Sequence, residues 1–348
     1  MKFVPLGLAS LATLVCVEGL ASIFVGVRDA PPPPQDRFAS ERKNCRYDAE
    51  LGWCLRPNLR IARYFRDGAT FTTNGQGHRG RVETTVDVPE GEYRIVCIGD
   101  SFTMGYGVSD EETFPHRLHE LDGVQCINQG VSGFGLDQIF LGYVRDGSKF
   151  DADLVLCCVI EDDLSRMLFQ RFAGRYPKPH LEVVDDELLV RNVPVPEEAA
   201  PSARGQRLIA ILHELGLARL VRRPNKARKK AIVEGTVDLK RVSEAVLRGL
   251  AEECRASKRE FVVVLLPTRR DLVKHRSEAS LLLGRLSKKV GVEFVDLTPE
   301  LRRVSPKERN RLFRVKEGDG HYTPEGNRRI AGLLFERLSL LVPGFPER

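Results

Sequence analysis

The sequence has no group of residues with the spacing of a metal site, and it has no internal repeat. Its 8 cysteines and 7 histidines are scattered over 348 residues, so nothing indicates a zinc site or a similar metal centre. A large excess of one charge is also missing, because the net charge of +6 is modest for this length and favours no particular partner. What remains is the composition of an ordinary globular protein, with 42% hydrophobic and 29% charged residues.

Charged residues are nearly absent from the amino terminus. Residues 3–27 carry a single charge, at Glu18, and about 20 apolar residues suffice to span a bilayer as a helix. We predict that residues 1–28 form an uncleaved membrane anchor with the rest of the chain outside the cytoplasm, an orientation that the flanking charges favour only weakly. A cleaved signal peptide is the alternative, since residues 19–21 offer small side chains, but the apolar run continues beyond them.

A linker and a small extension are expected next. Four consecutive prolines within residues 29–44 predict a stiff, extended spacer. Strand and turn signals then predict a β-rich extension over residues 45–90. In an extracytoplasmic domain, Cys45 and Cys54 would be placed to close a short loop by a disulfide, a pairing that the spacing alone does not establish.

From residue 91 to residue 345, short apolar runs alternate with helix-like segments. This alternation predicts an α/β fold in which a parallel sheet has helices on both faces. Between residues 165 and 235 the alternation lapses, which predicts an insertion with one hairpin, at a place suited to a lid or a substrate-selecting wall. The predicted strands are residues 95–98, 124–127, 154–160, 261–266 and 292–297, and the clearest helices are residues 113–121, 238–257 and 324–341.

One basic stretch lies within the predicted insertion. Residues 219–230 read RLVRRPNKARKK, a composition that suits contact with an acidic polymer or with lipid headgroups. A solvated charged surface explains the same residues, and nucleic-acid binding fits poorly beside a membrane anchor. We therefore predict no nucleic-acid partner.

Four polar stretches each follow a predicted strand or precede the last helix. Because the carboxyl ends of parallel strands share one edge of a sheet, we expect these stretches to converge there. A serine hydroxyl becomes a nucleophile when an imidazole takes its proton, and a carboxylate beside the imidazole fixes its tautomer. The stretches are GDS at residues 99–101, NQGVSG at 128–133, EDD at 161–163 and DGH at 319–321.

Three longer motifs carry a family resemblance. The stretches GDSFTMGYGV, NQGVSGFG and DGHYTPEGN together resemble the SGNH/GDSL hydrolase family, in particular its membrane-anchored bacterial members with an LGW-type amino-terminal segment. The resemblance covers residues 47–341 and implies a flavodoxin-like three-layer α/β/α sandwich that hydrolyses or transfers acyl esters, often on carbohydrate. By position, it makes Ser101 the nucleophile, His321 the general base and Asp319 the acid. It also makes the N–H groups of Ser101 and Gly133 oxyanion-hole donors.

We call GDS at residues 99–101 the first block, NQGVSG at 128–133 the second and EDD at 161–163 the third. The chain departs from the family pattern in the third block. The family has an asparagine whose amide donates to the oxyanion, and that position is held here by Asp162, or by Glu161 in a shifted alignment. An ionised carboxylate only accepts hydrogen bonds, and losing one oxyanion donor costs about 100- to 1000-fold in rate. Three outcomes are open: Asp162 is protonated, Asn128 supplies the amide, or the protein is slow or inactive. A milder departure is Gly318, which stands where many members have the acid, three residues before the histidine.

The sequence thus predicts a serine esterase or deacylase, held at the cell membrane by a single span, that acts outside the cytoplasm on acylated glycans or similar small esters, with O-acetyl esters favoured. An O-acyltransferase would use the same residues, and the sequence does not separate the two. A noncatalytic protein that keeps the fold and binds a glycan or another partner is a further alternative, motivated by the missing asparagine. None of these activities needs a metal or an organic cofactor.

Overall fold

The computed structural model describes residues 43–65, 68–173, 176–197, 226–273, 277–314 and 320–346. The chain divides into two compact units, one of residues 44–197 with 237–348 and the other of residues 1–43 with 198–236. The predicted anchor at residues 1–28 and most of the predicted linker lie outside the described residues. None of the helices in the described ranges combines the length and the apolar composition that a membrane span requires.

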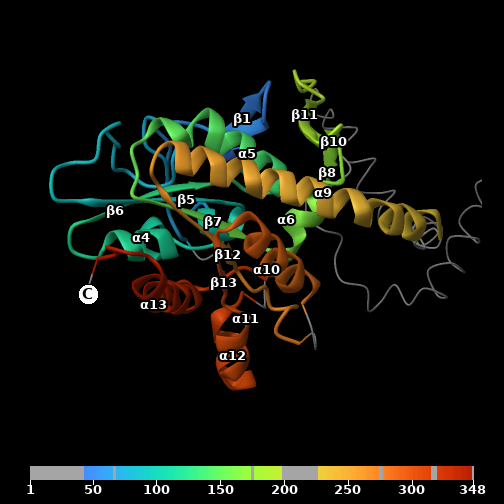
Figure 1. Ribbon diagram of the computed structural model, residues 1–348. Coiled ribbons are helices and arrows are strands. Elements are labelled where there is room, and N and C mark those ends of the chain that lie inside the picture. Colours follow the sequence, from blue (N-terminus) through green and yellow to red (C-terminus); the bar gives the residue numbers. More distant parts are fainter. Residues whose placement is uncertain are drawn as a thin grey trace, which may run out of the picture. The chain divides into compact units, whose positions relative to one another are not determined.

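A five-stranded parallel sheet forms the centre of the larger unit (Figure 1). All five predicted strands are found, with ends that differ by at most three residues. Their order, numbered along the chain, is 2-1-3-4-5, which is the order of flavodoxin-like doubly wound sheets. The central strand β7 is buried at all six positions because helices cover both of its faces. The strands are β5 (Tyr93–Gly99), β6 (Val124–Gly130), β7 (Leu154–Val159), β12 (Glu260–Leu265) and β13 (Glu293–Asp296).

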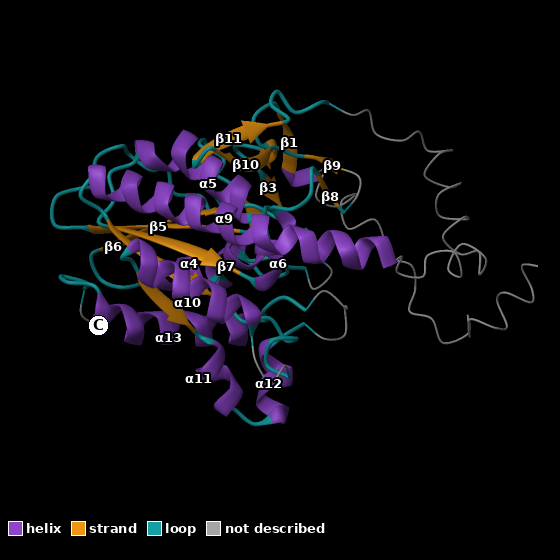
Figure 2. Cartoon of the chain, turned by 45° about the vertical axis from the view of Figure 1, so that its right-hand side comes forward, coloured by secondary structure: helices purple, strands orange, loops and turns teal. Residues whose placement is uncertain are grey.

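Helices cover both faces of this sheet, as predicted. Alternate side chains of β5 point to opposite faces, so Val96 and Ile98 join one core while Ile95 and Cys97 join the other. The first core is closed by α5 (Leu136–Arg145), α9 (Lys226–Ala256) and α10 (Glu278–Val290), and the second by α4 (Phe114–His119), α11 (Thr298–Arg303), α12 (Pro306–Leu312) and α13 (Pro324–Leu341). Figures 1 and 2 show α5 and α9 on one side of the strands and α13 on the other.

The segment before the sheet contains two small antiparallel ribbons. They are β1 (Cys45–Asp48) with β2 (Gly52–Leu55), and β3 (Arg60–Ile61) with β4 (Phe71–Thr72). The sequence left a disulfide between Cys45 and Cys54 open, and the structure does not form one. Cys45 lies opposite Leu55 in the ribbon, so Cys45 and the neighbouring Cys54 point to opposite faces.

The described part of the insertion holds two short hairpins, where one was predicted. After α6 (Glu161–Arg166) come β8 (Arg171–Phe172) with β9 (Tyr176–Pro177), then β10 (His180–Val184) with β11 (Glu187–Arg191). Lys178 lies between the hairpins, and its ammonium group forms an ion pair with Asp137 of α5. Both side chains are fully buried, so the pair fastens the insertion to the layer beneath it. Of the basic stretch at residues 219–230, residues 219–225 lie outside the described residues.

Candidate active site

Ser101 and His321 meet at the carboxyl edge of the sheet, although 220 positions separate them in the chain. Ser101 directly follows β5 as the first residue of the short helix α3 (Ser101–Met104). His321 lies two residues before Thr323, whose side chain caps the amino terminus of α13. The Ser101 Oγ and the His321 Nε2 are 2.8 Å apart, a distance at which the imidazole can take the hydroxyl proton. Two of the predicted site residues are therefore in hydrogen-bond contact.

Two aromatic rings hold the His321 imidazole in place. Its centroid lies 4.6 Å from the ring centroids of Phe102 and Tyr106, and its plane is tilted by 34° and 33° to those two rings. Both rings come from the turn that carries Ser101, so the nucleophile and the imidazole are positioned by one segment. Asp319, the predicted acid of the triad, lies outside the described residues.

The turn before Ser101 is built around a buried carboxylate and a close backbone approach. Asp100 caps α3, because its Oδ1 accepts the backbone N–H of Phe102 at 2.8 Å. Its Oδ2 lies 3.2 Å from the Ser101 hydroxyl. A Cβ on Gly99 would lie 2.1 Å from the Thr103 hydroxyl, so only glycine fits at the end of β5.

The second block is held between the amino-terminal extension and the insertion. The Trp53 indole N–H donates to the carbonyl of Ser132 at 2.9 Å. Next to it, Gly133 has a φ of 78°, a conformation that favours glycine. A Cβ at Gly133 would lie 3.0 Å from the Phe172 ring of β8. Gly133, the predicted oxyanion-hole residue, thus lies against Phe172, and its neighbour Ser132 is bound by Trp53; neither contact was indicated by a sequence motif.

Asn128 is engaged by backbone groups of the first two blocks. Its amide nitrogen donates to the carbonyl of Thr103 at 2.9 Å, and its side-chain oxygen accepts the N–H of Gly130 at 3.0 Å. The residue is buried, with 4% of its surface exposed. These bonds explain Asn128 as a clamp between the two blocks and disfavour the alternative in which it supplies the missing oxyanion donor.

The third block presents its carboxylates in different directions. The side chain of Asp162 is 43% exposed and pairs with the guanidinium of Arg270. Its neighbour Asp163 is fully buried and accepts the backbone N–H of Ile160, at the start of α6, at 2.9 Å. An ion-paired Asp162 is an arrangement that the sequence did not indicate.

Arg166 connects the three blocks and was not predicted as a site residue. Its Nη1 donates to Asp100 Oδ2 at 3.0 Å, to Asp163 Oδ1 at 2.5 Å and to the carbonyl of Phe134 at 2.8 Å. Burial, followed by the charge of Asp100, raises the pKa of Asp163, and the guanidinium opposes this shift. The one sequence signal was the three-residue spacing from Asp163 to Arg166, which puts both on one side of a helix.

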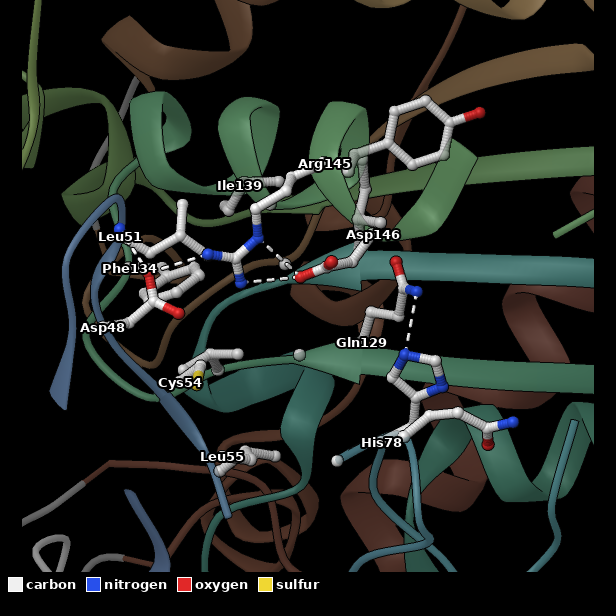
Figure 3. Close-up of a pocket in the computed structure, with 18 of the residues that line it drawn as sticks. Asp48, Leu51, Cys54, Leu55, His78, Gln129, Phe134, Ile139, Arg145 and Asp146 are labelled. Carbon is white, nitrogen blue, oxygen red and sulfur yellow. Dashed lines mark hydrogen bonds and ion pairs between the residues drawn. The ribbon is translucent and has the colours of Figure 1, made fainter. Parts of the chain in front are cut away.

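A cavity of about 430 Å³ lies beside this edge, and its lining includes neither Ser101 nor His321. On one side of it, Arg145 pairs with Asp48 and Asp146, and on another the His78 ring lies against Gln129 (Figure 3). Burial lowers the pKa of His78 to about 4, so this histidine is neutral at pH 7. The cavity is thus separate from the hydrogen-bonded pair of Ser101 and His321.

The arrangement suits acyl transfer through a serine nucleophile. A hydroxyl in hydrogen-bond contact with an imidazole is the minimum that such chemistry needs. Among the described residues, no group of three or more histidine, cysteine, aspartate or glutamate side chains could hold a metal ion.

Comparisons with known proteins give structural neighbours only. No family profile matches the chain, and no curated protein matches it. Among solved structures, a GDSL-like lipase from Bacteroides thetaiotaomicron is 15% identical, with 74% of this chain and 93% of that chain covered and a TM-score of 0.42. An acetyl xylan esterase is 12% identical, with 70% and 99% covered and a TM-score of 0.42. A variant of an acetyl-xylooligosaccharide esterase from Geobacillus is 12% identical, with 75% and 99% covered and a TM-score of 0.41. Function is therefore inferred from the residues and distances of this chain.

Proposed function

We propose that this chain is a serine esterase or deacylase of the SGNH/GDSL type that acts on acyl esters, O-acetyl esters of glycans in particular. The observation that carries the proposal is the hydrogen bond of 2.8 Å between the Ser101 hydroxyl and the His321 Nε2. It joins two of the three motifs on which the family resemblance depends, and it comes with a flavodoxin-like strand order.

In the proposed reaction, the Ser101 oxygen attacks the ester carbonyl while its proton passes to His321. The N–H groups of Ser101 and Gly133 stabilise the oxyanion, since backbone N–H groups aimed at developing negative charge are effective there. His321 then protonates the leaving alcohol, and water resolves the acyl-enzyme by the same proton route. Asp319 is proposed to orient His321. With a sugar hydroxyl in place of water, the same residues would make an acyltransferase.

The test uses the full chain with a fluorophosphonate probe and with p-nitrophenyl acetate. We expect Ser101→Ala to abolish labelling and turnover, because the variant has no nucleophile. Ser339→Ala is the matched control, since Ser339 lies exposed on α13 and its hydroxyl donates to the carbonyl of Phe335 in the same helix. Equal labelling of the unmodified protein and Ser101→Ala would remove the enzyme proposal.

A noncatalytic binding protein is the second candidate, and one observation favours it. The third-block position holds a carboxylate paired with Arg270 instead of an amide donor. Absence of labelling in both the unmodified protein and Ser101→Ala would support this candidate.

The membrane anchor at residues 1–28 stays part of the main proposal, and recovery of the full chain in the soluble fraction of cells would remove the anchor from it.

A further inference from the structure

The Ser101 hydroxyl has two acceptors within reach and one proton to give. His321 Nε2 lies at 2.8 Å and Asp100 Oδ2 at 3.2 Å. Donation to His321 leads to attack on the ester, whereas donation to Asp100 leaves the proton where no step of the reaction needs it. A carboxylate is a stronger acceptor than a neutral imidazole, so Asp100 is a competitor for this proton unless its charge is compensated.

Arg166 supplies that compensation. Its Nη1 donates to the same Asp100 oxygen that faces Ser101, at 3.0 Å. The other oxygen of Asp100 is occupied by the N–H of Phe102. Asp100 is fully buried, so water does not weaken it as an acceptor, and within the described part of the chain Arg166 is the cation that pairs with it.

The guanidinium is itself fixed from three sides. The guanidinium donates to Asp163 and to the carbonyl of Phe134, and the Arg166 Cζ lies 5.3 Å from the centre of the Phe172 ring. A planar guanidinium that is held in this way keeps its direction, which a flexible lysine would not. The charge on Asp100 is therefore compensated by a group that cannot easily turn away.

We propose that Arg166 is a positioning residue that keeps Asp100 from capturing the Ser101 hydroxyl, so that its proton is donated to His321. This inference rests on the proposed function, because it assigns a role within the same site. Without the guanidinium, the Asp100 carboxylate competes with His321 for the Ser101 hydroxyl proton.

The experiment compares Arg166→Met, Asp100→Asn and the double variant, in the full chain, by the rate of fluorophosphonate labelling and by kcat and KM for p-nitrophenyl acetate. We expect Arg166→Met to slow labelling by about 10- to 100-fold, the range of a hydrogen bond to a charged group, with the loss in kcat and not in KM. The double variant should label several-fold faster than Arg166→Met and close to the rate of Asp100→Asn alone. Asparagine caps a helix as well as aspartate does, so the second substitution preserves the start of α3.

The rescue separates positioning from a merely structural role. If Arg166 only held the loops together, replacing Asp100 as well would leave the activity as low as in Arg166→Met, and that result overturns the inference. Labelling of Arg166→Met at the rate of the unmodified protein overturns it too. Should Arg166→Met fail to fold, Arg166→Gln carries the same comparison. Arg145→Met is the matched control, since it removes an arginine of α5 whose ion-pair partners in the described part of the chain, Asp48, Glu50 and Asp146, lie outside the site.

The outcomes for the two proposals are distinct. Equal labelling of the unmodified protein and Ser101→Ala ends the proposed function and the inference with it. Labelling that depends on Ser101 but is indifferent to Arg166 and Asp100 leaves the proposed function standing and ends only the inference.

Discussion

Protonation of the buried His78 is expected to destabilise the folded protein at low pH. The residue is 9% exposed, and its Nδ1 makes no hydrogen bond with any side chain or backbone group of the described residues. Burial lowers its pKa from 6.5 to about 4, and the charge of Asp146 opposes the shift. Below pH 6.5 the unfolded chain therefore binds a proton that the folded protein does not bind until about pH 4.

The sign and size of the effect follow from these two values. A histidine whose pKa is lower in the folded protein contributes to stability at neutral pH and loses that contribution on acidification. With 6.5 in the unfolded chain and about 4 in the folded protein, the loss between pH 7 and pH 4 is about 3 kcal/mol, since one pKa unit is worth about 1.4 kcal/mol.

The assay is urea unfolding of the unmodified protein and of His78→Gln at both pH values. Carboxylates and other groups titrate equally in the two proteins, so the difference between their losses isolates His78. We expect the unmodified protein to lose about 3 kcal/mol more than the variant on acidification. Gln76→Ala controls for disturbance of the same turn, because Gln76 lines the same cavity and does not titrate. Losses that agree within about 1 kcal/mol would refute the reasoning.

Two further predictions concern the insertion and the third block. Lys178→Met leaves the fully buried Asp137 without its cation and is expected to lower the free energy of unfolding by about 3–5 kcal/mol, and adding Asp137→Leu should restore most of this loss. Urea unfolding measures the stability of the single and the double variant, and a Lys178→Met protein as stable as the unmodified protein would contradict the prediction. Asp162→Asn puts an amide at the third-block position and is expected to raise p-nitrophenyl acetate turnover by up to about 100-fold. Arg270→Met is the control, because it removes only the ion-pair partner of Asp162, and an unchanged rate in Asp162→Asn would contradict a place for Asp162 in the oxyanion hole.

The sheet was predictable because each strand is an apolar run that is buried on both faces. Such a run has one stable environment, between two layers of helices, and β7 shows it with six buried residues in succession. Whether Cys45 and Cys54 pair was left open by the sequence, for a reason that spacing cannot reveal. The register of β1 and β2 decides which face each cysteine occupies, and a shift by one residue would reverse it.

The candidate site also has residues that the sequence indicated and contacts that it could not reveal. Ser101 and His321 were indicated by motifs at strand and helix ends, where a parallel sheet collects its loops. The sequence placed Asp162, or Glu161 in a shifted alignment, at the third-block position, but it did not show which groups Asp162 and its neighbour Asp163 contact. On a helix, neighbouring residues point about 100° apart. The start of α6 thus decides which of the two meets Arg270 at the surface and which meets Arg166 inside.

The sequence by itself determined the order of strands and helices along the chain and the candidate nucleophile and base, because these depend on local hydrophobic pattern and on short motifs. Only the tertiary structure decided the partners of these polar side chains: Arg166 with Asp100, Lys178 with Asp137, and the Trp53 indole with the Ser132 carbonyl of the second block. Each of these contacts joins residues more than 40 positions apart. The energies of these contacts depend on burial and on the direction of single side chains, and neither can be predicted from the local sequence.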